Sequence, residues 1–111
     1  MDNLEKYRQT IQNILLQHAK IPYAHGEIKN QTFFETQRDS YILLAIGWQK
    51  NRRIHHCLVH TDIINGKIWV QIDGTEYGIA NKLIDAGIPK EKIVLGFHPP
   101  EIRKHTGFAV E

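Results

Sequence analysis

The fold predicted for this chain is built around residues 54–73, IHHCLVHTDII-NG-KIWVQID. Two runs with the composition of strands flank Asn65-Gly66, a dipeptide that favours a two-residue hairpin turn because both central residues of a type I′ turn need a positive φ. The turn sets a register that starts with Ile64 opposite Lys67. The pairs that follow are Ile63 with Ile68, Asp62 with Trp69, Thr61 with Val70, His60 with Gln71, and Val59 with Ile72.

Alternation of side chains divides this hairpin into two faces. The predicted core face carries Cys57, Val59, Thr61, Ile63, Ile68, Val70 and Ile72. The predicted outer face carries His56, Leu58, His60, Asp62, Ile64, Lys67, Trp69, Gln71 and Asp73. Because the outer face mixes polar groups with apolar bulk, we expect any function of the sheet to lie on it or at its edge.

Length and composition are those of an ordinary globular domain. The chain has 111 residues, 23% charged and 41% hydrophobic, with a formal net charge of +2, and we expect one domain over 1–111. So small a charge does not by itself indicate a nucleic-acid partner. The single cysteine, Cys57, fits a reducing compartment. Without a bilayer-spanning apolar run or the apolar region of a signal peptide, we expect a cytoplasmic location and no membrane contact.

The N-terminal part predicts an amphipathic helix. Asp2 or Asn3 can cap it, and it runs to about Lys20, because Pro22 disfavours helical conformation in the residue before it. Apolar positions recur at three- and four-residue steps and form one stripe. The stripe consists of Leu4, Tyr7, Ile11, Ile14, Leu15, His18 and Ala19.

The remainder predicts an α+β fold. Strands over 27–37 and 41–48, with the hairpin of residues 54–73, form a four-stranded antiparallel meander. A helix over about 77–86 follows, capped by Thr75 and ended by Gly87 in a Schellman motif. Residues 93–97 are either helix or strand. The short tail that ends the chain carries aromatic residues, so we expect it to dock on its own core or on a neighbour.

The strand predicted over 41–48, YILLAIGW, is apolar on both faces. This pattern is typical of a central strand that is covered on both sides. Two helices can hardly cover both sides of a four-stranded meander. We therefore expect a homodimer or a higher homo-oligomer, in which the tail or a neighbouring subunit covers the second face.

The histidines of the hairpin suggest a possible metal site. His56 and His60 are predicted to share a strand face with Asp62, and such groups can bind zinc. Two residues along a strand span about 7 Å, so one strand cannot give three ligands to one ion. The completing ligand would have to be His25, His98 or His105. A metal-dependent enzyme that uses this histidine cluster is kept as the second alternative function.

Other motifs do not specify an enzyme. Cys57 lies on the predicted core face, where a free cysteine behaves as a small hydrophobe. Gly74 and Gly78 precede a predicted helix but lack the Lys-Ser/Thr end of a phosphate-binding loop. We expect no cofactor and no catalytic residue.

Several separated segments share one pattern. They are GWQKNRR at 47–53, GKIWVQ at 66–71, DGTE at 73–76, GIPKE at 87–91, VLGFH at 94–98 and RKHTGFA at 103–109, with YRQ at 7–9, IPY at 21–23 and GE at 26–27. Together they resemble the XisI family, small cyanobacterial factors that control excision of the fdxN DNA element. The resemblance covers nearly the whole chain.

The resemblance implies an α+β fold and a part in the programmed excision of a DNA element by site-specific recombination. It also implies a partner, an XisH-like protein that resembles endonucleases, whereas the recombinase is a separate protein. No catalytic residue is established for the family, so none is carried over. We expect a non-enzymatic accessory factor that acts as a protein-interaction module for the XisH-like protein.

Two sets of residues are candidates for these contacts. Aromatic and arginine side chains are enriched in interface cores, and the expected partner surface comprises Trp69, His60, Asp62, Arg52 and Arg53. The first alternative function is direct DNA binding through the basic loop and the tail, where cations would meet phosphates. The expected nucleic-acid contacts are Lys50, Arg52, Arg53, Arg103 and Lys104.

Overall fold

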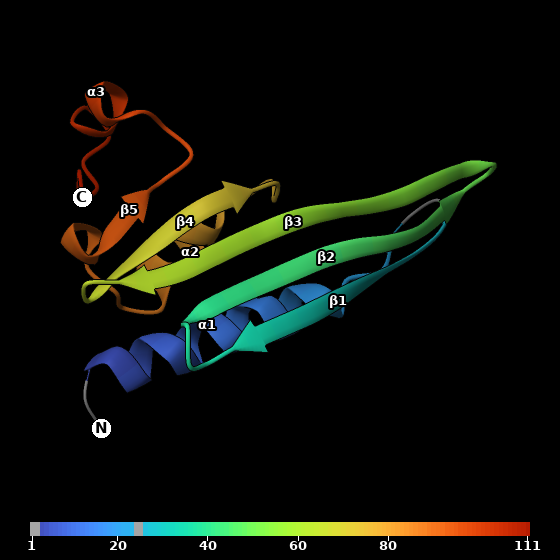
Figure 1. The fold of residues 1–111 in the computed structure, drawn as a ribbon, viewed down its shortest axis with the longest axis horizontal. Helices are drawn as coiled ribbons and strands as arrows, with labels where there is room; N and C mark the ends of the chain where they lie inside the picture. Colours follow the sequence, from blue (N-terminus) through green and yellow to red (C-terminus); the bar gives the residue numbers. More distant parts are fainter. Residues whose placement is uncertain (1–2, 24–25) are drawn as a thin grey trace.

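A five-stranded sheet forms one layer of the molecule, as the computed structural model of residues 3–23 and 26–111 shows (Figure 1). Its strands are β1 (Glu27–Glu35), β2 (Ser40–Gln49), β3 (Arg52–Ile64), β4 (Lys67–Asp73) and β5 (Ile93–Leu95). They lie in the order β1-β2-β3-β4-β5. The molecule is elongated, measuring 43 × 34 × 24 Å.

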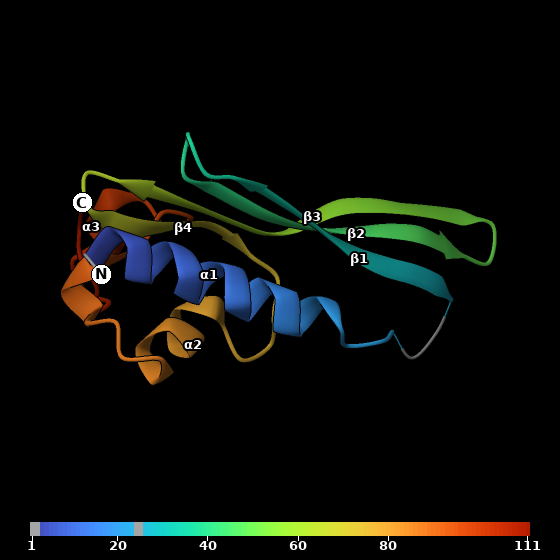
Figure 2. The ribbon, with the colours of Figure 1, turned by 90° about the horizontal axis from the view of Figure 1, so that it is seen from below.

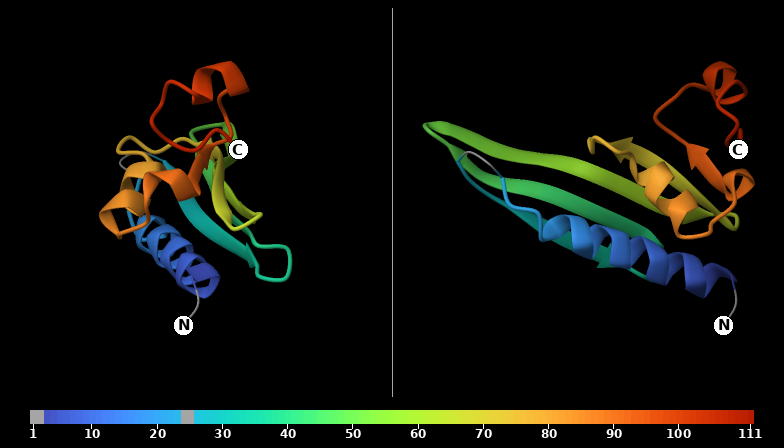
Figure 3. Two further views of the ribbon diagram at one scale, coloured as in Figure 1. Left: turned by 90° about the vertical axis from the view of Figure 1, so that its left-hand side faces the viewer. Right: turned by 180° about the vertical axis from the view of Figure 1, so that it is seen from behind.

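Helices α1 (Asn3–Ala19) and α2 (Ile79–Asp85) form the second layer, and both lie on the same face of the sheet (Figures 2 and 3). The short η1 (Lys90–Lys92) leads into β5, and α3 (Pro100–Arg103) belongs to the tail. The predicted N-terminal helix is confirmed; of its two candidate caps, Asp2 lies outside the described residues. No helix in the described part of the chain has the length and apolar character needed to cross a membrane.

The sheet corrects the predicted four-stranded antiparallel meander. Strands β1 to β4 are antiparallel neighbours, but β5 adds a fifth strand parallel to β4, with Ile68 beside Ile93. Residues 93–97 were ambiguous by length, and only the return of the chain through α2 brings them alongside β4. The central strand is therefore β3. Residues 41–48 form an interior strand as expected, since β2 lies between β1 and β3, although β3 stands at the centre of the five strands.

The predicted hairpin of residues 54–73 is confirmed close to its turn. Asn65 and Gly66 have φ values of 50° and 77°, as a type I′ turn requires. The predicted pairs hold from Ile64 with Lys67 to Thr61 with Val70.

Beyond those pairs a β-bulge shifts the hairpin's register. His60 pairs with Ile72 and Val59 with Asp73, so the predicted pairs His60 with Gln71 and Val59 with Ile72 are wrong. Gln71 is the extra residue. The bulge turns Ile72 to the outer face, where it is 44% exposed, and Asp73 to the helix side.

A second bulge lies in β3, where Val59 pairs with Leu43 but Cys57 pairs with Leu44. Leu58 is the extra residue, and it packs against the core although it was predicted on the outer face. The shift exchanges the faces of the residues before it, because paired residues in a sheet share a face. Cys57 therefore lies on the outer face and His56 on the helix side, the reverse of the prediction.

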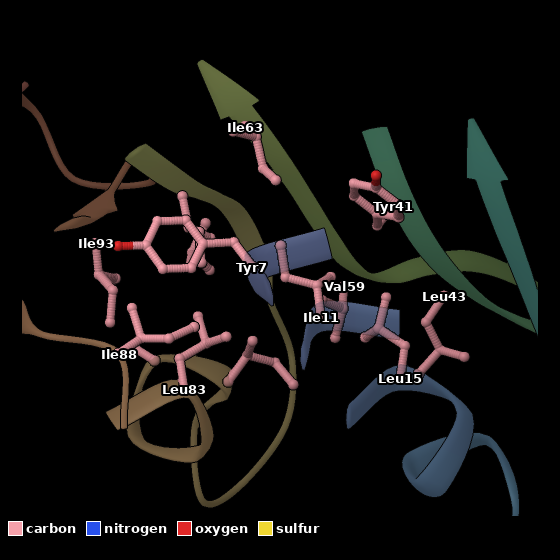
Figure 4. Close-up of a cluster of buried hydrophobic side chains, with 14 residues drawn as sticks. Tyr7, Ile11, Leu15, Tyr41, Leu43, Val59, Ile63, Leu83, Ile88 and Ile93 are labelled. Atoms are coloured by element: carbon pink, nitrogen blue, oxygen red, sulfur yellow. The ribbon is translucent and has the colours of Figure 1, made fainter. Parts of the chain in front are cut away.

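The core lies between α1, α2 and the sheet, as Figure 4 shows. Tyr7, Ile11 and Leu15 of α1 are buried there against Tyr41 and Leu43 of β2. Five residues of the hairpin's predicted core face are confirmed as buried. They are Val59, Thr61, Ile63, Ile68 and Val70.

Identifiable hydrogen bonds fix both ends of α2. The helix ends in a Schellman motif as predicted, with Gly87 at φ 96° and the Ile88 amide donating to the Leu83 carbonyl at 3.1 Å. Its start differs from the prediction. The helix begins at Ile79, whose amide donates to the Asp73 carboxylate at 2.6 Å. The N-cap residue is Gly78, and the side chain that accepts from the first helical amide is Asp73 rather than Thr75, because the bulge turns Asp73 to the helix side.

The tail docks on its own core, as predicted. Phe108 is partly buried against the core cluster, and the Ala109 amide donates to the Ile93 carbonyl at 2.9 Å. Val94 and Ala109 form a parallel β-bridge. This contact covers the β5 edge of the sheet and leaves β1 as the exposed edge strand.

Candidate functional site

The face of the sheet that points away from α1 and α2 is the candidate functional surface, and we call it the open face. The alternating burial along β2 distinguishes the two faces of the sheet. Tyr41, Leu43 and Ala45 are fully buried on the helix side, whereas the residues between them, on the open face, are only half-buried. The described helices leave the open face uncovered over β1, β2 and β3 (Figure 2). The described helices therefore cover residues 41–48 on one face only.

Apolar side chains follow β2 along the open face and form what we call the apolar stripe. The stripe comprises Ile42, Leu44 and Ile46 of β2, Phe33 of β1 and Cys57 of β3. Phe33 is 49% exposed. Partial burial raises the pKa of the Cys57 thiol, so this side chain behaves as a small apolar group.

A polar cluster adjoins the stripe and centres on Asp62. The carboxylate accepts hydrogen bonds from the Ser40 hydroxyl at 2.6 Å and the Gln71 amide at 3.2 Å, and His60 Nε2 lies 3.0 Å from it. The bulge in β4 places Gln71 within reach. The sequence pattern identified His60 and Asp62 but missed Ser40 and Gln71, which come from a neighbouring strand and from the bulge.

The order of groups in the polar cluster does not match a hydrolase triad. In such a triad the histidine stands between the nucleophile and the carboxylate. Here the carboxylate of Asp62 stands in the middle, and both Ser40 and His60 meet its Oδ1. The cluster therefore fixes the orientation of His60 and does not activate Ser40.

Trp69 lies beside the polar cluster, opposite Asp62 in the register. The Arg103 guanidinium lies over its ring, 5.1 Å from the centroid. Arg103 also donates to the carbonyls of His98 at 2.8 Å and Val110 at 3.2 Å. Arg103 thereby ties the tail to Trp69 and holds the indole in place.

The far end of the sheet extends beyond α1 as a narrow projection (Figures 1 and 2). We call it the basic arm and define it as residues 26–29 and 46–55. Its tip is the turn at Lys50 and Asn51, between the paired residues Gln49 and Arg52. Arg53 lies over the Trp48 ring at 5.1 Å from the centroid.

The structure does not bring the predicted contact residues into one patch. Lys50, Arg52 and Arg53 lie on the arm, whereas Arg103 and Lys104 lie in the tail at the other end of the long axis (Figure 1). Arg52 and Arg53 are likewise separate from the polar cluster. Arg53 and His60 are seven positions apart in β3, which is about 23 Å of strand.

The predicted histidine cluster does not assemble. His56 and His60 lie on opposite faces because of the bulge at Leu58, so they cannot share a metal ion with Asp62. Within residues 3–23 and 26–111, no three His, Cys, Asp or Glu side chains are grouped so that they could hold a metal. His25, one proposed completing ligand, lies outside the described residues.

The fold and the surface define a class: a small α+β protein with its helices on one face of the sheet and an amphipathic open face on the other. A family model described as "XisI protein" matches residues 1–110. The chain belongs to the XisI family, which confirms the resemblance found in its sequence.

Two solved structures share this fold over the whole chain. A XisI-like protein from Anabaena variabilis ATCC 29413 is 34% identical, with a TM-score of 0.89, covering 98% of this chain and all of that one. The fdxN element excision controlling factor XisI from the same organism is 36% identical, with a TM-score of 0.84, covering 99% of this chain and all of that one. The comparison with curated proteins gave no match.

Proposed function

We propose that this protein is a non-enzymatic accessory factor that controls the excision of a DNA element. Membership of the XisI family supports the process, since a 36% identical member is named as an excision controlling factor. The arrangement of the polar cluster supports an action without triad catalysis, because both Ser40 and His60 meet the Asp62 carboxylate and the histidine does not stand between them.

The mechanism proposed is binding of an XisH-like, endonuclease-fold protein. The observation that carries this proposal is the open face, which places Trp69 and the polar cluster side by side outside the helical layer. Tryptophan is enriched at the energetic centres of interfaces. We assign the partner contact to Trp69, His60 and Asp62, and not to the distant Arg52 and Arg53.

These residues are already ordered before a partner arrives. Hydrogen bonds from Ser40 and Gln71 fix Asp62, and Arg103 fixes the ring of Trp69. Binding therefore costs little additional side-chain entropy, which favours affinity for a given contact area.

Co-purification with the XisH-like protein of the same genome tests this proposal. Asp62→Lys reverses a charge at the centre of the surface, and we expect it to weaken binding about tenfold or more, as loss of an interface centre does. The matched control is Glu76→Lys, the same charge change in the groove between α1 and α2 on the other face. Glu76→Lys should bind like the natural protein.

Two results would contradict the proposal. One is a natural protein that forms no complex with the XisH-like protein at micromolar concentration. The other is a folded Asp62→Lys variant, judged by circular dichroism, that binds as tightly as the control.

A further inference from the structure

We propose that the basic arm binds the phosphate backbone of duplex DNA. The inference goes beyond the partner contact, since it concerns a different surface at the other end of β3 and stands without that contact.

Positive charge is concentrated on the arm. Its cations are Lys29, Lys50, Arg52 and Arg53, and its single acid is Glu27. Four positive charges and one negative charge give the arm +3, whereas the whole chain carries only +2, so the rest of the chain sums to −1. The small net charge of the whole chain therefore does not reveal the local excess of positive charge on the arm. A local excess of this kind attracts polyanions.

The arm's cations are available to a ligand. All four are exposed. The ion pairs found among the described residues join Arg8 to Glu5 and Asp39, and His60 to Asp62, so none of them uses a cation of the arm. Arg53 donates one long hydrogen bond, to the Gly47 carbonyl, whereas Arg103 of the tail donates to two backbone carbonyls.

The shape of the tip suits a groove of DNA. Beyond the pair Glu27 with Trp48, where β1 ends, the tip consists of the pair Gln49 with Arg52 and the turn that joins them, so its outermost part is a short two-stranded ribbon. The major groove of B-DNA, about 12 Å wide, admits such a ribbon. Arg52 and Arg53 are neighbours on a strand and so point to opposite faces. A ribbon with cations on both faces can meet the phosphates on either side of the groove.

Two local features prepare the tip for this contact. The Trp48 ring supports the Arg53 guanidinium, which also donates to the Gly47 carbonyl at 3.4 Å. Lys50 has a φ of 57°, in the left-handed region that glycine and asparagine occupy more easily. A lysine at this position adds backbone strain to the turn, and it places a cation in the turn at the tip of the arm.

Fluorescence anisotropy with a 20-base-pair DNA duplex tests the proposal. If three side chains neutralise three phosphates, log K should fall with log[salt] at a slope of about −2.7, so binding should weaken about 40-fold between 50 and 200 mM salt. The triple variant Lys50→Gln, Arg52→Gln, Arg53→Gln should lose this binding. All three positions are exposed, and thermal unfolding should match that of the natural protein.

A matched control removes the same charge elsewhere. The triple variant Lys6→Gln, Arg38→Gln, Lys92→Gln changes residues away from the arm and should bind DNA within about twofold of the natural protein, because the contact is local to the arm. Arg52→Lys with Arg53→Lys keeps the charges and should retain the slope with salt.

The proposal is overturned if the natural protein does not bind duplex DNA at 50 mM salt, if binding does not change with salt, or if the control variant loses as much affinity as the arm variant. Equal affinity for heparin or double-stranded RNA would also overturn it, since the deep, narrow major groove of RNA cannot admit the ribbon. The arm variant should still co-purify with the XisH-like protein, so this experiment and the partner experiment fail independently.

Discussion

Asp39 shows how one residue connects separate elements. It lies in the β1–β2 turn with a φ of 55°, and the Arg8 side chain of α1 donates to its two oxygens at 2.7 and 3.2 Å. The Tyr41 hydroxyl donates to it at 2.9 Å. The hydrogen bonds from Arg8 lower the pKa of Asp39, while burial and the Asp39 carboxylate raise the pKa of Tyr41 to about 12.

We expect Asp39→Asn to lower the free energy of unfolding at pH 7 by about 1 kcal/mol, since a partly exposed ion pair contributes little more than that. Asparagine tolerates a positive φ, so the change removes mainly the charge. A carboxylate with a lowered folded-state pKa stabilises the fold above its unfolded pKa of about 3.9 and loses that effect as pH falls through the folded value.

The difference between the natural protein and Asp39→Asn should therefore be constant above about pH 5 and shrink as the pH falls below about 4. Urea unfolding at a series of pH values measures it. A difference that is independent of pH down to pH 2 would show that the ion pair does not stabilise the fold.

At the scale of the element, α1 illustrates how a periodic pattern becomes a packed face. Leu15 is fully buried under the sheet, whereas its neighbour Leu16 is 44% exposed. One step of about 100° around the helix separates them. The same residue type therefore occupies two environments within one turn, which makes a matched pair for mutation.

We expect Leu15→Ala to lower the free energy of unfolding by about 3 kcal/mol, because it removes buried apolar atoms and leaves a cavity. Leu16→Ala should cost less than about 0.5 kcal/mol, as for most surface substitutions. Chemical denaturation of both variants checks the pair. Equal losses would mean that α1 packs in a different rotation from the one described.

At the scale of the whole molecule, the apolar stripe needs an occupant. We expect a second copy of this chain, because the stripe itself carries no charge and two copies can bury it against each other without desolvating an ion. A face of about 30 Å by 15 Å over three strands lies at the low end of specific interfaces. The dimer should therefore be weak and concentration-dependent. Packed with the strands running in opposite directions, it would carry one basic arm at each end.

Light scattering between about 10 and 200 µM, the range that a small interface implies, measures this association. Leu44→Asp and Phe33→Lys should both give monomers, because each places a charge in the stripe. The control Leu16→Asp, on the exposed side of α1, should dimerise like the natural protein. A sharp monomer mass for the natural protein at 200 µM would contradict the prediction.

The candidate site was only partly predictable from the sequence. Trp69, His60 and Asp62 were assigned to the outer face, and the structure places them there. Gln71 was assigned to the same face, but only the bulge brings its amide to Asp62. The separation of Arg103 from the basic arm could not be read from the sequence, since it depends on the path of the whole chain.

The local features follow from the amino-acid sequence alone, because each depends on residues close together in the chain. Asn65-Gly66 forms the hairpin turn, Gly87 ends α2, and the periodic apolar side chains of α1 pack into the core. The two bulges, the fifth strand and the uncovered face of the sheet depend on the fold of the whole chain. Those features follow from competition between distant segments for the same core, and a one-residue slip in a strand exchanges its faces without changing its local composition.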